Sequence, residues 1–110
     1  MKHIHYSDVE AKAVGDEAPG VSMRWLVSKD DGAPNFGMRH FTVEPGGHTP
    51  QHTHAWEHEV FVLGGSGAVW CEGDERALGP GDAVYMPPNA EHFFRNTGGE
   101  PFTFLCLVPN

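Results

Sequence analysis

Glycine and proline interrupt this sequence at short intervals, and that punctuation constrains its fold more than any other feature. The 110 residues include 14 Gly and 9 Pro, which leave few stretches long enough for a helix. Between these breakers lie short runs rich in β-branched and aromatic residues, joined by tight turn sequences such as Gly64-Gly65-Ser66-Gly67. Many short strands with tight turns are typical of an antiparallel sandwich or barrel. We therefore predict an all-β fold with negligible helix. The expected strands are Val21–Val27, Phe36–Val43, Glu57–Leu63, Ala68–Cys71, Ala83–Met86, His92–Arg95 and Phe102–Val108.

The length and charge of the chain narrow the possible classes of function. One domain over residues 1–110 is expected, in which the weakly patterned residues 1–20 wrap around the outside. The formal net charge of −8 argues against nucleic-acid binding, which needs a basic surface. No apolar run approaches the roughly 18 residues of a membrane span, and the start lacks a signal-peptide pattern. With only two cysteines, we expect a cytoplasmic protein with reduced thiols.

Histidines are the clearest functional signal. Three of the eight fall within residues 51–58, immediately before a predicted strand. His52, His54 and His58 have the same parity, so in an extended chain their side chains share one face. Neutral imidazole is the commonest protein ligand for transition metals. The pattern therefore predicts a metal site, and a polar loop of unrelated surface histidines is the less favoured reading.

A second metal motif overlaps the same residues. His54-Ala55-Trp56-Glu57-His58 matches the H-x-x-E-H pattern of inverted zinc peptidases, which needs both histidines on one helix. Pro50 precedes the segment, and Val60, Phe61 and Val62 favour a strand directly after it. The sequence therefore argues against the peptidase interpretation.

The segment 46–65 resembles the first cupin motif, G-x5-H-x-H-x3-E-x6-G. Gly46, His52, His54 and Gly65 stand at the spacings of the motif, and His58 takes the place of its Glu. The segment 81–96 resembles the second cupin motif, G-x5-P-x-G-x2-H-x3-N. Its matching positions are Gly81, Pro87, His92 and Asn96.

Two positions depart from these motifs. Choosing Glu59 in place of His58 would need a longer spacing and would put Ser66 where the final Gly belongs, so we favour His58. Glu57 and Glu59 have the opposite parity and are expected to face away. Asn89 stands where the second motif has Gly, a mild departure because Asn tolerates positive φ better than most residues.

The resemblance implies a single-domain cupin jelly-roll β-barrel and, more narrowly, a small cupin with a four-histidine manganese site. It implies one divalent ion per chain held by His52, His54, His58 and His92. Mn2+ is favoured, and Fe2+, Ni2+, Zn2+ and Cu2+ are alternatives. We expect an oxidoreductase, a dioxygenase or a peroxide-dependent enzyme that cleaves a small organic substrate, with no catalytic residue beyond the metal centre. The alternative is a non-redox isomerase or a metal-dependent small-molecule binding module.

Four further residues are candidates to line the substrate cavity: Arg39, Trp56, Phe104 and Cys106. Arg39 could anchor an anionic substrate. Alternation does not reveal which face of the strands that bear Arg39 and Cys106 points inward, because both faces of the last strand can be buried. We also expect a homodimer, because short barrels of this type expose apolar strands. The candidates for its covered face are Val21, Met23, Trp25, Val27 and Trp70.

Overall fold

The protein is built from nine antiparallel strands and two single-turn 3-10 helices. The computed structural model describes residues 1–110. The two helices are η1 (Tyr6–Asp8) and η2 (Lys29–Asp31). The strands are β1 (Lys12–Ala13), β2 (Val21–Val27), β3 (Phe36–Val43), β4 (His58–Gly64), β5 (Gly67–Cys71), β6 (Asp74–Leu78), β7 (Ala83–Met86), β8 (His92–Asn96) and β9 (Phe102–Pro109). No helix in the structure has the length and apolar character needed to cross a membrane.

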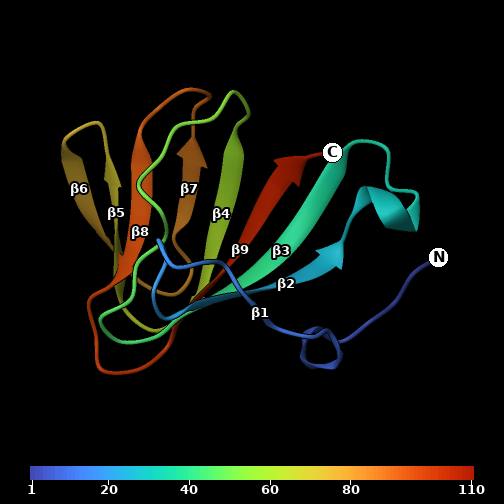
Figure 1. The fold of residues 1–110 in the computed structure, drawn as a ribbon, viewed down its shortest axis with the longest axis horizontal. Helices are drawn as coiled ribbons and strands as arrows, with labels where there is room; N and C mark the ends of the chain where they lie inside the picture. Colours follow the sequence, from blue (N-terminus) through green and yellow to red (C-terminus); the bar gives the residue numbers. More distant parts are fainter.

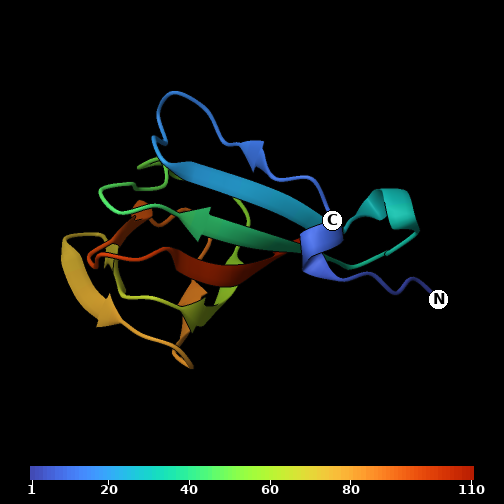
Figure 2. The same cartoon turned by 90° about the horizontal axis from the view of Figure 1, so that it is seen from below.

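The strands form two sheets, and Figure 1 shows them side by side. The larger sheet has the order β1-β2-β3-β9-β4-β7, and the smaller one has the order β6-β5-β8. Figure 2 shows β2, β3 and β9 as successive strands of one wall, and both termini lie at the same end of the molecule. Isolated bridges from His48 to Arg95 and from His52 to His92 attach the loop between β3 and β4 to the smaller sheet. The all-β fold expected from the sequence is confirmed.

All seven predicted strands are present, and each begins and ends within one residue of the expected position. The sequence reasoning missed β1 and β6. The missed β6 is a hairpin partner of β5 and begins after the turn Glu72-Gly73, in which both residues have positive φ. Its sequence, Asp-Glu-Arg-Ala-Leu, is polar, and almost all of it is exposed. A strand at a sheet edge with no buried face has no hydrophobic alternation by which to find it.

The N-terminal residues do more than wrap the outside. Tyr6 of η1 stacks on His40 of β3, with ring centroids 4.6 Å apart, on the outer face of the larger sheet. Further along, β1 pairs with β2. Ala18 is buried in the core, and Val14 packs against the core from its edge. The segment therefore closes one end of the space between the sheets.

The inner faces of the two sheets make the core. Phe102, Phe104, Cys106 and Val108 of β9 are buried, while the intervening residues of the same strand are only half-buried. Two residues of the expected dimer face lie inside the molecule, since Val21 is buried in the core and Met23 packs against it, whereas Trp25 stays exposed. Exposed apolar residues on the outer face of the larger sheet are Phe61, Leu63 and Tyr85, and Phe36 at the start of β3.

Gly65, in the turn between β4 and β5, is expected to be important for the stability of the fold. Gly65 has φ +80°, and a Cβ there would lie 2.9 Å from the Cα of Phe102 and overlap the carbonyl of Pro101. We expect Gly65→Ala to lower the free energy of unfolding by roughly 3 kcal/mol, since it combines left-handed strain with a backbone clash. Gly73→Ala is the matched control, because Gly73 has φ +86° but open space around it. Its loss should be about 1 kcal/mol. Equal losses in urea unfolding would refute the role of the clash.

Candidate metal centre

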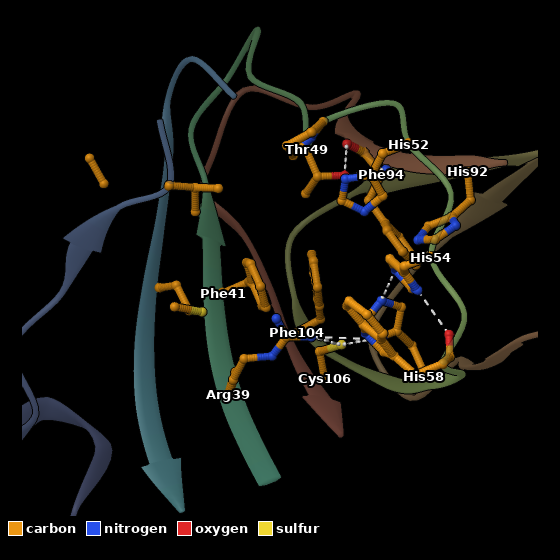
Figure 3. Close-up of a pocket in the computed structure, with 15 residues that line it drawn as sticks. Arg39, Phe41, Thr49, His52, His54, His58, His92, Phe94, Phe104 and Cys106 are labelled. Atoms are coloured by element: carbon orange, nitrogen blue, oxygen red, sulfur yellow. Dashed lines mark hydrogen bonds between the residues drawn. The ribbon is translucent and has the colours of Figure 1, made fainter. Parts of the chain in front are cut away.

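Four histidines from two separate parts of the chain meet at one cavity (Figure 3), with His58 and His92 buried and His52 exposed. His52 and His54 lie on the loop between β3 and β4, while His58 and His92 are the first residues of β4 and β8. The ring centroid of His54 is 4.3 Å from that of His58, 5.0 Å from that of His52 and 5.0 Å from that of His92. His52, His54 and His92 each contribute one ring nitrogen to a group of three atoms that all lie within 4.8 Å of one another. The structure thus brings together all four predicted ligands.

Backbone hydrogen bonds hold the two segments together. His52 and His92 exchange N–H to carbonyl bonds of 3.3 and 3.2 Å. The N–H of Asn89 donates to the carbonyl of His54 at 2.7 Å. Asn89 has φ +67°, so it adopts the left-handed conformation for which the second motif has glycine, as the sequence predicted. These bonds fix the spacing between the first and the second cupin motifs.

Two of the histidines are fixed in orientation by carbonyl groups. The Nδ1 atom of His54 is 2.8 Å from the carbonyl oxygen of Trp56, and that of His92 is 2.8 Å from the carbonyl oxygen of Ala90. Since a carbonyl can only accept, Nδ1 donates in both rings and Nε2 carries the lone pair. An outer hydrogen bond of this kind is how proteins orient metal-binding imidazoles. The Nε2 atom of His92 is therefore left as a possible metal ligand, while that of His54 is in contact with His58.

The fourth imidazole lies against His54 on one side and against Arg39 and Cys106 on the other. The Nε2 atoms of His58 and His54 are 2.6 Å apart. Two imidazole nitrogens at this distance share a proton; because His54 carries its proton on Nδ1, His58 Nε2 donates and His54 Nε2 accepts. His58 Nδ1 is 3.3 Å from the Cys106 Sγ and 3.3 Å from an Arg39 guanidinium nitrogen. The donor set, four imidazoles without a carboxylate, fits a divalent transition-metal ion.

The reason for the convergence differs in one respect from the sequence argument. Residues 52–57 do not form a regular strand, because β4 begins at His58. His52 and His54 reach the centre through the bridge to β8 and a bend at residues 55–56, not through strand alternation. Within β4 the alternation does hold, since His58 is buried and Glu59 is exposed on the opposite face. Neither Glu59 nor Glu57 lines the cavity.

The four histidines line one wall of a cavity of about 270 Å3. All four predicted cavity residues, Arg39, Trp56, Phe104 and Cys106, line it as well. The faces of β3 and β9 that bear Arg39 and Cys106 therefore point inward, which settles what the sequence left open. Trp56 stacks on His54 with ring centroids 4.5 Å apart and stays 49% exposed, so it stands at the mouth.

Sequence reasoning missed part of the apolar lining. Phe41 and Phe94 line the cavity, as do Val14 and Met23. Phe41 and Phe94 lie two residues beyond Arg39 and His92 on the same strands, so their place on the same face was a usable signal. Val14 carried no such signal, since it lies in the irregular segment before β2.

Burial favours the neutral form of His58 and His92. It lowers the pKa of His58 from 6.5 to about 3, with a further contribution from the positive charge of Arg39. Burial also lowers the pKa of His92. Both shifts favour the neutral form, which is the form that binds metals.

The shift at His58 predicts acid sensitivity of the metal-free protein. Because its pKa is lower in the folded than in the unfolded chain, unfolding takes up a proton once the pH falls below about 6.5. The contribution of His58 to the free energy of unfolding is complete above this pH and is lost as the pH falls toward 3. From pH 7 to pH 5 we expect a loss of about 2 kcal/mol from His58. Urea unfolding with a chelator present, at both pH values, measures it; His58→Gln should lose correspondingly less, and equal losses would contradict the assignment.

Comparison with known proteins supports the geometry of the fold. The family model described as "Cupin domain" matches residues 39–108, which include both motifs, all four histidines and strands β4 to β8 in full. The chain belongs to the cupin family. The sequence-based resemblance is therefore confirmed at the level of the family.

Solved and curated relatives of this cupin differ in function. The polyketide cyclase RemF from Streptomyces resistomycificus superposes with a TM-score of 0.91 at 37% identity, over 99% of this chain and 79% of RemF. Rru_A2000 from Rhodospirillum rubrum, a cupin-2 domain, gives 0.86 at 29% identity, over 98% and 74% of the two chains. A 1-methylthio-D-xylulose 5-phosphate methylsulfurylase from R. rubrum is 37% identical over 71 residues, 64% of this chain. This cupin spans only 46% of that enzyme.

Proposed function

We propose that this cupin is a metal-dependent enzyme that holds one divalent ion through His52, His54, His58 and His92 and acts on a small organic molecule in the adjoining cavity. The observation that carries the proposal is the convergence of four imidazoles on one wall of an otherwise largely apolar cavity. Unrelated histidines have no structural reason to cluster in this way, because burying the imidazoles of His58 and His92 costs solvation.

The chain's own residues position the reactants. The carbonyls of Trp56 and Ala90 orient His54 and His92, and the aromatic and aliphatic lining excludes water from the bound substrate. A bound ion would supply Lewis acidity and, for manganese or iron, a change of oxidation state. The cavity is lined by no Asp or Glu, and its histidines are the proposed ligands. Apart from these groups, only the Cys106 thiol could transfer a proton, and burial raises its pKa.

We favour an oxidoreductase, a dioxygenase or a peroxide-dependent enzyme that cleaves a small organic substrate. With no free carboxylate or histidine in the cavity, acid–base chemistry by protein side chains is poorly supported. Mn2+ is the favoured ion, and Fe2+, Ni2+, Zn2+ and Cu2+ are the alternatives.

A non-redox reaction is the second candidate. The observation that favours it is the likeness to RemF, a polyketide cyclase, over almost the whole chain. An apolar cavity beside a Lewis acid also suits ring closure or isomerisation of an enolisable ketone.

Reconstitution tests the proposal that a metal is required. The chelated protein, reloaded with one ion at a time, is incubated with diketones, enols and styrene-like alkenes, with oxygen or peroxide present or absent. Products are followed by mass spectrometry and oxygen uptake by an electrode. Turnover should appear only in reloaded protein. Equal turnover by the chelated protein would reject a metal-dependent enzyme.

We propose further that two copies pair through the outer face of the larger sheet. Phe61, Leu63 and Tyr85 are 46%, 43% and 59% exposed there, and half-buried Leu105 of β9 lies directly opposite Phe61. Glu59 interrupts this patch beside Tyr85, but an exposed group of large apolar side chains of this kind is typical of an interface.

Sedimentation measures the predicted pairing. The wild-type protein should sediment as a dimer at micromolar concentration, and Phe61→Asp should shift it to monomer, because the buried carboxylate would lack a partner. Phe36→Asp is the control at the far end of the same face, since Phe36 is 69% exposed and lies opposite Pro109, four residues along β9 from the Leu105 that lies opposite Phe61. A wild-type monomer would overturn the proposed dimer.

A further inference from the structure

Arg39 lies in the cavity with no anionic partner. Its guanidinium donates to the Cys106 Sγ at 3.0 Å and approaches His58 Nδ1 at 3.3 Å. The guanidinium carbon is 5.0 Å from the ring centre of Phe41 and 5.5 Å from that of Trp25. The Arg39 Nε is buried and has no hydrogen-bond partner. Two aromatic rings and a sulfur thus hold the side chain in place, and no anionic group pairs with its guanidinium. Figure 3 shows Arg39 beside Phe41 and Cys106.

No carboxylate forms an ion pair with Arg39. The chain has 15 Asp and Glu, but none lines the cavity. The ion pairs in the structure are Lys2–Asp31, Arg76–Asp74 and Arg95–Glu75, all at the surface. A half-buried cation without a counter-ion costs solvation energy. A divalent ion on the four histidines would add two more positive charges to the same cavity.

The remaining surface of the cavity favours a flat, apolar molecule. The rings of Phe41 and Phe104 lie parallel, 5.1 Å apart, and the ring of Phe94 packs against Phe104 at 5.1 Å. Trp56 stands at the mouth. The volume of about 270 Å3 is near the lower end of the range for small-molecule sites. It suits a single ring or a short conjugated chain.

We propose that the cavity selects organic anions with a flat apolar body, such as aromatic or conjugated carboxylates, and that Arg39 pairs with the anionic oxygen. This inference rests on the proposed function, because it names the substrate class of the same cavity. Arg39 is a permanent cation and a planar hydrogen-bond donor, the side chain best suited to a carboxylate. The unpartnered Arg39 Nε and the missing carboxylates are both explained if the substrate supplies the negative charge.

Binding of benzoate, compared with its neutral analogue benzamide, tests the inference. Calorimetry and the intrinsic tryptophan fluorescence report binding to the chelated and to the metal-loaded protein, independently of turnover. Benzoate should bind at least about tenfold more tightly than benzamide, because only benzoate can form a charge-assisted bond. Arg39→Gln should remove this preference in the chelated protein, whereas Arg39→Lys should keep part of it.

Arg24→Gln is the matched control. Arg24 also has a buried Nε without a hydrogen-bond partner. It lies opposite His40 in the register of β2 and β3, on the outer face of the larger sheet. The Arg24→Gln variant should bind benzoate as tightly as the wild-type protein does. No preference for benzoate in the wild-type protein, or an unchanged preference in a folded Arg39→Gln variant, overturns the inference. Metal affinity, measured separately, tests the proposed function, so the two failures are distinguishable.

Discussion

We expect the replacement of His58 with Ala to lower the affinity for Mn2+ about 100-fold or more while the fold is retained. Loss of a residue that merely orients a ligand costs about 10- to 100-fold in metal affinity, so loss of a ligand should cost at least as much. The same loss is expected for His52→Ala, His54→Ala and His92→Ala. Competition with a chelating dye measures the affinity. The far-ultraviolet circular dichroism should be unchanged, because the apolar core does not depend on these side chains.

Glu59→Ala is the control for His58→Ala. Glu59 is adjacent in sequence and exposed on the opposite face of β4, so its removal should leave metal affinity unchanged. The opposite pattern, with full affinity in His58→Ala and loss in Glu59→Ala, would show that the carboxylate of the cupin motif is supplied by Glu59. The four-histidine assignment would then be wrong.

The turn residues and the alternating strands explain why so much of the fold was predictable. The central strands β3, β4 and β9 each bury one face, so their alternation reflects a physical requirement that local sequence records. The inward direction of Arg39 was not predictable. Both faces of β3 carry residues that can be buried, and only pairing with β2 and β9 determines which face meets the core.

The candidate centre was found for a reason that is only partly correct. The parity of His52, His54 and His58 suggested a continuous strand, whereas the structure places two of them on an irregular loop. The spacing nevertheless identified histidines that the structure brings together, because the cupin motifs record the loop geometry and its anchor at Asn89. The hydrogen bond from Arg39 to Cys106 joins residues 67 positions apart. A contact of that kind leaves no periodic trace in the sequence.

The identity of the ion separates the two candidate reactions. Loaded with Zn2+, the protein should retain less than about 1% of the turnover of the manganese form if the reaction is an oxidation, because zinc fills the same imidazole ligands without changing its oxidation state. Oxygen uptake and product formation, measured on protein of known metal content, follow the effect. As a control, the affinity for zinc is measured separately, to make sure that the four histidines are fully occupied by zinc in the assay.

Retention of turnover by the zinc form would contradict the oxidoreductase assignment. Cyclisation or isomerisation needs only the polarisation of a bound oxygen, which zinc supplies as well as manganese does. Activity in the absence of oxygen and peroxide would support the same conclusion by an independent route. The cavity residues would keep their roles in that case, since Arg39 and the aromatic walls bind and orient the substrate in either reaction. The comparison therefore isolates the chemistry from the binding, which the His58→Ala variant cannot do because it removes the ion altogether.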